Sequence, residues 1–304
     1  MNNLRSEEFR TWRRARWILA VAAFTAAGVQ AQNPVEDDLY GHVLLLEGKT
    51  SAERGTYIET TLRKSGVGYM TTPFRKVFIN RGDTVRIAGN NIVARIGRGS
   101  KRVVVGAHFD VSTDSPGAND NGSGTAVALE LVRRLSRLDW NCSIDVCFFD
   151  QEEAGNVGST QYIRQFVIPS QYVIMINVDV VGMGDELYVG PTTGSGSSVL
   201  ALFRDAAQEL GVRMVEGREY PSSDHESFTK ARLQSISMSV VPAGDGQRLS
   251  TYLRNSGAVD SSSVPRLLSV IHTPDDRSIY VQPASLKLAF EVMSIVLRRL
   301  NEQL

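Results

Sequence analysis

The stretch VVVGAHFDVSTDSPGANDNGSG, which runs from Val103 to Gly124, decides how the rest of the chain is interpreted. It opens on an unbroken apolar run, which is typical of a central strand covered on both faces of a sheet. Polar and ionisable side chains follow at once, among them His108, Asp110 and Asp120. Because such groups are costly to bury without a partner, their place directly after a buried strand indicates a site at its carboxyl end.

Apolar runs and helical patterns alternate over most of the sequence. Thr50 and Glu53 have capping-box spacing, which predicts a helix that ends near Gly66. The pattern further predicts strands at 101–109, 142–150, 172–182, 186–190 and 235–241, and helices at 124–138, 158–166, 198–211, 223–231 and 283–304. This alternation predicts an α/β fold, a three-layer sandwich around a mixed, mostly parallel central sheet. Sheets of this kind place ligands at the carboxyl ends of their strands.

Two stretches are less regular. Segments 75–80 and 84–96 are predicted to be strands, and Gly89 with Asn90 predicts a turn that divides the second segment. Residues 243–264 are rich in Gly and Ser and are predicted to form a long loop.

The first 31 residues differ from the rest in composition. Several arginines, including Arg13 and Arg14, precede the apolar run WILAVAAFTAAGV, and small residues at Val29 and Ala31 suit a cleavage site. The pattern predicts a signal peptide at 1–31, export to the periplasm or the medium of a bacterium, and no stable membrane insertion after cleavage. The alternative is an uncleaved membrane anchor. The remaining residues, 32–304, are predicted to form a single domain.

The charge balance disfavours a nucleic-acid-binding protein, and the cysteine spacing disfavours a disulfide. Without residues 1–31 the chain holds 28 basic and 31 acidic side chains, so no basic excess supports nucleic-acid binding. Cys142 and Cys147 lie five residues apart on a predicted strand, a span of about 16 Å that exceeds the reach of a disulfide. The two residues are therefore interpreted as buried thiols.

Polar groups follow the predicted strands in a regular manner. His108 lies at the end of the first central strand, Glu152 and Glu153 follow the second, Asp179 lies near the end of the third, and His272 comes late in the chain. Imidazole and carboxylate together suit a cation such as zinc. Five or more ligands exceed one tetrahedral site and suit two metals that share a carboxylate. The Glu152-Glu153 doublet can supply one ligand and one base.

Six motifs together resemble the zinc exopeptidase family that contains the bacterial secreted leucyl aminopeptidases, the glutaminyl cyclases and glutamate carboxypeptidase. They are GAHFD (106–110), GANDNGSG (117–124), DQEEAGNVGS (150–159), INVDVVG (176–182), SDHESF (223–228) and HTPDD (272–276). The resemblance covers roughly residues 50–304 and implies that the predicted domain is a catalytic domain with the zinc-exopeptidase fold, two zinc ions and peptide substrates.

The same resemblance assigns roles to individual residues. It makes Asp120 the bridging carboxylate and Glu152 the general base. It gives the remaining ligand positions to His108, Glu153, Asp179 and His272. Asp110 is expected to accept a hydrogen bond from the far nitrogen of His108. The family pattern also implies a cis peptide bond between Asp120 and Asn121.

Four further positions carry weaker expectations. Tyr220 matches a tyrosine that donates to the developing oxyanion in some bacterial aminopeptidases, with an ordinary loop tyrosine as the alternative. Asp224 and His225 are expected beside the metal ligands, where His225 would line the substrate cleft. The alternatives are a helix-start residue packed beside Asp224 for His225 and a plain helix N-cap for Asp224. Arg277 stands where the family usually has Thr, and is expected to alter the hydrogen bonding or the rim of the pocket.

The resemblance favours an exported aminopeptidase that removes N-terminal residues from peptides. A glutaminyl cyclase with one zinc uses the same scaffold. A carboxypeptidase needs a cation for the terminal carboxylate, which Arg218, Arg232 or Arg277 would supply. A binding ectodomain that has lost its ligands is the alternative without catalysis.

Overall fold

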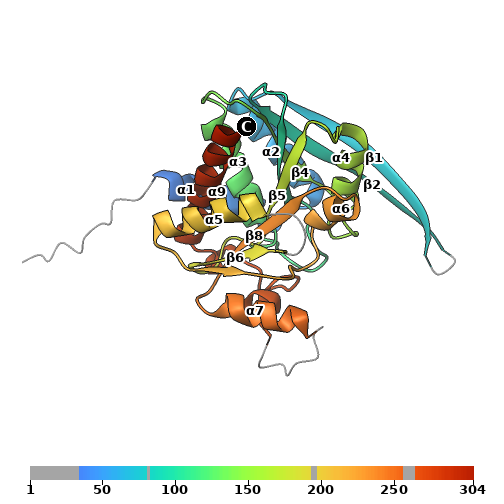
Figure 1. Ribbon diagram of the computed structural model, residues 1–304. Coiled ribbons are helices and arrows are strands. Elements are labelled where there is room, and N and C mark those ends of the chain that lie inside the picture. Colours follow the sequence, from blue (N-terminus) through green and yellow to red (C-terminus); the bar gives the residue numbers. More distant parts are fainter. Residues whose placement is uncertain (1–33, 81–82, 193–196, 256–263) are drawn as a thin grey trace, which may run out of the picture. The chain divides into compact units, whose positions relative to one another are not determined.

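The computed structural model describes residues 34–80, 83–192, 197–255 and 264–304 (Figure 1). Residues Asn33–Leu304 form one compact unit. The predicted signal peptide lies outside the described residues. Among the described helices, none is long and apolar enough to cross a membrane.

One mixed sheet forms the centre of the fold, in the strand order β1-β2-β4-β3-β5-β8-β6-β7. Its strands are β1 (Tyr69–Asn80), β2 (Asp83–Ile96), β3 (Arg102–His108), β4 (Ser143–Phe149), β5 (Tyr172–Val178), β6 (Glu186–Gly190), β7 (Met214–Glu216) and β8 (Ser235–Val241). Strands β4, β3, β5 and β8 run parallel and occupy the middle, while β1, β2 and β6 add antiparallel pairings. The predicted fold class is therefore confirmed, and the four parallel strands end at a common edge.

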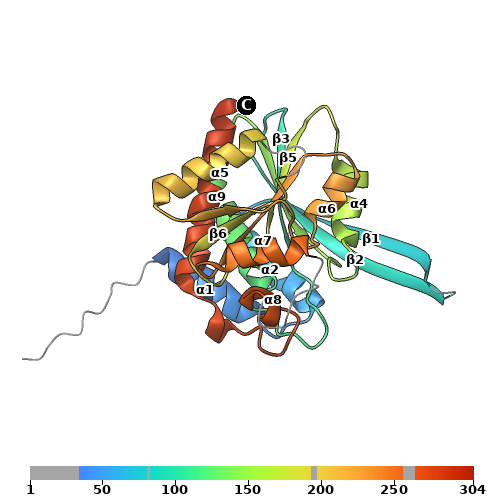
Figure 2. The same cartoon turned by 60° about the horizontal axis from the view of Figure 1, so that its bottom comes forward.

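Helices cover both faces of the sheet, as Figures 1 and 2 show. They are α1 (Pro34–Leu46), α2 (Ser51–Lys64), α3 (Gly122–Leu135), α4 (Val157–Phe166), α5 (Ser197–Leu210), α6 (His225–Lys230), α7 (Asp245–Arg254), α8 (Arg266–Val270) and α9 (Pro283–Gln303). On β3, Val103 and Val105 belong to the larger core cluster, which also contains side chains of α3 and α9. Val104 belongs to a second cluster with Tyr162 of α4 and Phe228 of α6. A strand apolar on both faces is thereby buried on both faces.

The capping box predicted at Thr50 is present. The Thr50 hydroxyl accepts the Glu53 backbone N–H at 3.3 Å, and the Glu53 carboxylate accepts the Thr50 N–H at 2.9 Å. These bonds satisfy two groups that a helix start leaves unpaired. Gly66 has a φ of +70°, a left-handed conformation that suits glycine and ends the segment as predicted.

The turn predicted at Gly89 and Asn90 is wrong. β2 runs through both residues, and Gly89 pairs with Phe74 of β1. A Cβ at Gly89 would lie 2.6 Å from the Asp150 carboxylate and from the Phe74 ring, so the glycine makes room for a close contact instead of a turn. The Asn90 N–H donates to Asp150 at 2.9 Å, which ties β2 to the end of β4.

The long loop predicted at 243–264 is also wrong in its first half. Residues Asp245–Arg254 form α7. Leu249 is buried against Tyr188 and Leu267, so tertiary packing stabilises this helix despite the polar composition of the segment. The short helix α8 and the edge strand β7 were not expected from the sequence either. Cys142 and Cys147 are both buried free thiols.

A buried ionic cluster joins α1, α2 and α3. The Glu130 carboxylate accepts bonds of 2.7 to 2.8 Å from Arg133 and Arg134, and lies 3.3 Å from His42 Nε2. His42 Nδ1 is 2.6 Å from the Tyr57 hydroxyl, so His42 is a packing residue that links α1, α2 and α3. Burial by itself would raise the pKa of Glu130, but the bonds from His42 and the two arginines lower it to about 2.

Candidate active site

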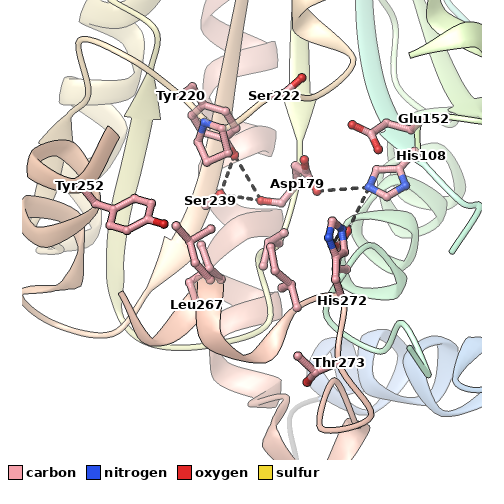
Figure 3. Close-up of a pocket in the computed structure, with 15 residues that line it drawn as sticks. His108, Glu152, Asp179, Tyr220, Ser222, Ser239, Tyr252, Leu267, His272 and Thr273 are labelled. Carbon is pink, nitrogen blue, oxygen red and sulfur yellow. Dashed lines mark hydrogen bonds and ion pairs between the residues drawn. The ribbon is translucent and has the colours of Figure 1, made fainter. Parts of the chain in front are cut away.

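The carboxyl edge of the parallel strands gathers the predicted polar residues (Figure 3). His108 is the last residue of β3, and Asp179 directly follows β5. Glu152 and Glu153 follow β4, and His272 follows α8. Because β3 lies between β4 and β5 and is parallel to both, these side chains meet although they are far apart in sequence.

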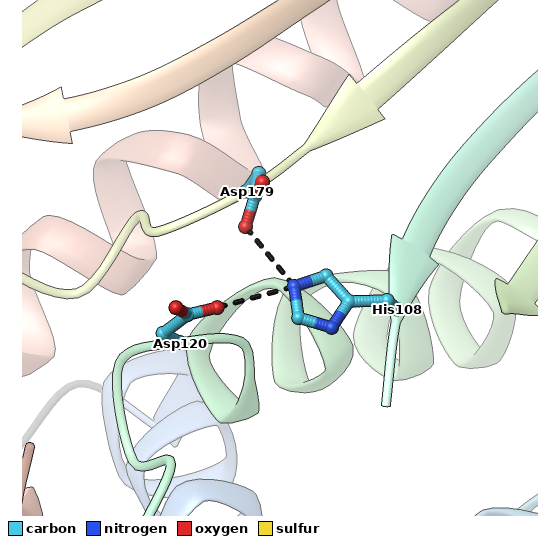
Figure 4. Close-up of side chains that lie close together, drawn as sticks. All are labelled: His108, Asp120 and Asp179. Carbon is cyan, nitrogen blue, oxygen red and sulfur yellow. Dashed lines mark ion pairs between the residues drawn. The ribbon is translucent and has the colours of Figure 1, made fainter. Parts of the chain in front are cut away.

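Asp120 lies at the centre of this group and divides its two oxygens. One oxygen is 3.1 Å from His108 Nε2, which is itself 3.5 Å from Asp179 (Figure 4). The other oxygen is 3.0 Å from His272 Nε2, which is 3.2 Å from Glu153. Asp120 therefore belongs to two groups of three potential ligands, and the ligand atoms within each group lie within 4.8 Å of one another.

These residues fit a pair of divalent cations such as zinc. One buried oxygen of Glu153 has no hydrogen-bond partner, and the Asp179 oxygen that faces His108 at 3.5 Å makes no hydrogen bond either. Unpartnered buried carboxylate oxygens are costly, and a metal ion would satisfy them. Each group offers one imidazole and two carboxylates, which is a ligand set that zinc accepts, and one carboxylate is shared, as a bridged pair requires. His272 is 53% exposed, so the second group opens to solvent.

Glu152 is the carboxylate beside both groups that does not belong to the Asp120 pairings. Ligand atoms of His108, Glu152 and Glu153 lie within 4.8 Å of one another. Burial raises the pKa of Glu152 well above its ordinary value, and the nearby carboxylates of Asp224 and Asp179 raise it further. Hydrogen bonds to Asp120 and Glu153 raise the pKa of His272 to about 10 in the absence of a metal.

Asp110 lies beside His108 and serves a second purpose that the sequence did not indicate. Its carboxylate is 3.5 Å from His108 Nδ1, which is longer than a well-formed hydrogen bond. The same carboxylate accepts the backbone N–H groups of Glu152 and Glu153 at 3.0 and 3.1 Å. Asp110 therefore fixes the backbone of the glutamate doublet as well as facing His108. The peptide bond from Asp120 to Asn121 is cis, as predicted.

Tyr220 lines the cavity, but its hydroxyl is engaged elsewhere (Figure 3). The phenol oxygen is 2.5 Å from Ser239 Oγ and 3.4 Å from the Asp179 carbonyl. Ser239 donates its own proton to that carbonyl at 2.7 Å, so the Tyr220 O–H is left to donate to Ser239. Donation from Tyr220 to a substrate oxygen therefore requires the O–H to rotate.

Asp224 and His225 are buried behind the cavity and are not among its lining residues. Asp224 occupies the N-cap position of α6, but its side chain makes no capping bond, and both of its carboxylate oxygens lack partners. Burial raises the pKa of Asp224 to about 7 and lowers that of His225 to about 4. The His225 ring meets Tyr220 edge-on at 5.4 Å and thus supports its position.

Arg277 points away from the cavity. Its Nε lies 3.6 Å from the Glu47 carboxylate, and the side chain is 58% exposed. Arg218 and Arg232 are exposed as well and do not line the cavity. The Thr-to-Arg departure in the HTPDD motif therefore changes the surface near the N-terminal helices and adds no cation to the pocket.

The cavity has a volume of about 570 Å³ and combines an acidic floor with an apolar wall. Its carboxylate and imidazole groups come from His108, Asp120, Glu152, Asp179 and His272. Tyr252, Leu267, Leu268 and Ile271 form the apolar part, on α7, α8 and the residue after α8. None of the described residues that line it is Arg or Lys.

Two buried charged residues beside the site were missed in the sequence. Arg54 on α2 donates to backbone carbonyls of the loop that precedes Asp120, and the Asp276 carboxylate accepts backbone N–H groups of the same loop. A signal was available for each. Arg54 falls on the apolar face of its helix, four residues before Ile58, and Asp276 is the last residue of the HTPDD motif.

Comparison with known proteins identifies the family. The sequence profile described as peptidase family M28 matches residues 91–297. The chain is 36% identical over 139 residues to aminopeptidase YwaD of Bacillus subtilis, and 31% identical over 224 residues to an aminopeptidase of Pseudomonas aeruginosa. These alignments cover 44% and 68% of this chain. They span only 30% and 41% of the two relatives, which are much longer proteins.

Solved structures share the fold. A zinc aminopeptidase from Bacillus subtilis superposes with a TM-score of 0.67 at 17% identity, over 87% of this chain and 94% of that one. The glutaminyl cyclase of Porphyromonas gingivalis superposes with a TM-score of 0.68 at 21% identity, over 90% of this chain and 100% of that one. At these identities the likeness shows the architecture alone. The family profile, by contrast, covers more than half of the sequence, and the chain belongs to peptidase family M28.

Proposed function

We propose that this protein is an exported, zinc-dependent aminopeptidase. The observation that carries the proposal is the pair of three-residue ligand groups that share Asp120, with Glu152 beside them. His108 and Asp179 would complete one zinc site, and Glu153 and His272 the other. The names of the curated relatives support the reaction class. Export rests on the leader pattern of residues 1–31.

Glu152 and Asp110 have distinct tasks in the proposed peptide hydrolysis. Zinc, when bound, supplies Lewis acidity toward the peptide carbonyl and lowers the pKa of water. Glu152 accepts a proton from the attacking water and later delivers it to the leaving amine. Glu152 suits this exchange because its carboxylate lies beside both ligand groups without belonging to the Asp120 pairings. Asp110 keeps Glu152 in place through the backbone bond.

The cavity favours a free amino terminus over a free carboxyl terminus. Its charged lining consists of carboxylates and histidines, and its described lining residues include no Arg or Lys. A carboxypeptidase needs a cation to hold the terminal carboxylate of its substrate. The three arginines considered for that task, Arg218, Arg232 and Arg277, do not line the cavity. We therefore infer that peptides bind with their α-ammonium group toward the acidic floor.

The proposal is tested with matched substrates. Zinc-loaded protein should release nitroaniline from leucine p-nitroanilide and should leave the N-acetylated substrate and carboxypeptidase substrates intact. Conversion of an N-terminal glutaminyl peptide to its pyroglutamyl form, without hydrolysis of either nitroanilide, would instead establish the cyclase alternative.

The assignment of Glu152 is tested by the variant Glu152→Gln. Loss of a general base typically costs about 10²- to 10⁴-fold in rate, so kcat should fall by that factor while the zinc content stays unchanged. Glu216→Gln is the control, because Glu216 lies on the edge strand β7 and pairs with Arg204 outside the cavity. Wild-type turnover by Glu152→Gln would refute the assigned base.

A further inference from the structure

The loop that carries Asp120 is held between two buried charges that come from opposite ends of the chain. Arg54 lies on α2, and Asp276 lies after α8. Both side chains are 0% exposed. Burial of a charge is costly unless bonds and opposite charges compensate it, so the positions of these two groups need an explanation.

Arg54 holds the carbonyl side of the loop. Its Nη2 donates to the carbonyl oxygens of Pro116 and Gly117, both at 2.9 Å, and its Nη1 is 3.5 Å from the Phe109 carbonyl. Gly117 has a φ of +65°, and a Cβ at this position would lie 2.5 Å from Nη2. The glycine therefore permits the guanidinium to reach the backbone.

Asp276 holds the amide side of the same loop. Its two carboxylate oxygens accept the backbone N–H groups of Asn119 and Asp120 at 2.7 and 3.0 Å. Its backbone carbonyl accepts the N–H of Ala118 at 3.1 Å. Each residue from 116 to 120 therefore has a backbone group that is hydrogen-bonded to Arg54 or to Asp276.

The charge of Arg54 also counters the carboxylates of the site, to which Asp276 adds one more. Burial lowers the pKa of Arg54, but only to about 10, because the carboxylates of Asp276, Asp120, Asp110 and Glu153 oppose the shift. The guanidinium therefore stays charged at neutral pH. It offsets the mutual repulsion of the carboxylates. Its Nη1 and Nη2 atoms donate to backbone carbonyls and not to a ligand oxygen, and its Nε is buried without a hydrogen-bond partner.

We propose that Arg54 and Asp276 are positioning residues that fix the loop 116–120, so that the two oxygens of Asp120 face different metal sites. The inference rests on the proposed zinc pair and is independent of the peptidase activity. It predicts that either residue controls zinc affinity without contacting zinc. Supporting groups of this kind typically contribute 10- to 100-fold to metal affinity.

The first test is Asp276→Asn, which keeps the shape of the side chain. An amide nitrogen cannot accept an N–H, so one of the two bonds to the loop is lost together with the charge. The zinc Kd, measured by competition with a chromophoric chelator, should rise by about 10- to 100-fold. Asp275→Asn is the matched control, because Asp275 is the exposed neighbour in the same motif, and its zinc Kd should equal that of the wild type.

A second pair of variants separates positioning from folding. Arg54→Met removes the donors and the charge, whereas Arg54→Lys keeps the charge but loses the planar fork. We expect the zinc Kd to rise most for Arg54→Met and by an intermediate factor for Arg54→Lys. The unfolding midpoint of each metal-free variant shows how far stability alone has changed.

The proposal would be overturned if Asp276→Asn and Arg54→Lys both kept the wild-type zinc Kd while their metal-free unfolding midpoints fell. Both residues would then be purely structural. The outcome is separable from the proposed function. Zinc binding by the wild type without hydrolysis of leucine p-nitroanilide would refute the aminopeptidase and leave the Kd comparison valid.

Discussion

The shared position of Asp120 predicts that two single substitutions differ in how many zinc ions they remove. His272 belongs to one ligand group, whereas Asp120 belongs to both. His272→Ala should therefore leave about one zinc per chain, and Asp120→Asn should leave almost none. His272 is 53% exposed, so its loss removes little packing, and Asn preserves the shape of the buried Asp120.

The size of the effect follows from ligand linkage. At a free zinc concentration 100-fold above the Kd of a site, binding adds about 2.7 kcal/mol to the free energy of unfolding, and two independent sites add about 5.4 kcal/mol. The wild type should therefore gain about 5.4 kcal/mol from zinc, His272→Ala about 2.7 kcal/mol, and Asp120→Asn close to zero.

The assay is denaturant unfolding with and without zinc, together with metal content by mass spectrometry. His42→Ala is the control, because His42 bonds Tyr57 and Glu130 and does not belong to either ligand group. This variant should lose stability but keep the full zinc increment. Equal increments for His272→Ala and Asp120→Asn would refute the shared carboxylate. A wild-type increment of about 2.7 kcal/mol with one zinc per chain would favour the single-metal arrangement of the cyclase alternative.

Three further predictions concern single residues. Glu130→Gln should lower the free energy of unfolding at pH 7 by about 1–2 kcal/mol. This is less than the lowered pKa of Glu130 alone implies, because the Arg133 and Arg134 side chains that bind it are one-third exposed. A carboxyl with a lowered pKa stabilises the fold only above its ordinary pKa, so the stability difference between wild type and variant should vanish as the pH falls from about 4 to about 2. A difference that stays constant in denaturant unfolding over this range would contradict the prediction. Gly89→Ala should cost about 1–3 kcal/mol, because the added Cβ meets the Asp150 carboxylate; an unchanged midpoint would show that β2 shifts freely. Tyr220→Phe should lower kcat by about 10²-fold with little change in KM if the phenol turns toward the substrate, whereas Ser239→Ala should have a small effect; wild-type kcat in Tyr220→Phe would leave Tyr220 a support for the backbone near the site.

The sequence predicted those elements correctly whose structure depends on residues only a few positions apart. The apolar run before His108 predicted a doubly covered strand, and Thr50 with Glu53 predicted a helix start, since both depend on residues within a few positions. The order of strands and helices then placed the polar strand ends at one edge, because parallel strands share a direction. The motifs at these positions were sufficient to predict the family and to name the candidate metal ligands.

The errors and omissions involve contacts between distant segments. Gly89 resembles a turn residue, and only the approach of Asp150, 61 positions later, shows that it provides space within a strand. The segment around Leu249 is rich in Gly, Ser and other polar residues, which favoured a loop, yet it forms α7, where Leu249 packs in one cluster with Tyr188. Tertiary packing outweighs local preference in both cases.

The sequence by itself determined which residues are available to bind metal and on which kind of fold they lie. Only the tertiary structure decided how they are used. It divided the oxygens of Asp120 between His108 and His272, turned Arg277 toward Glu47, and brought Arg54 and Asp276 to one loop. These outcomes depend on distances between groups that lie up to 230 positions apart, which a single sequence does not record.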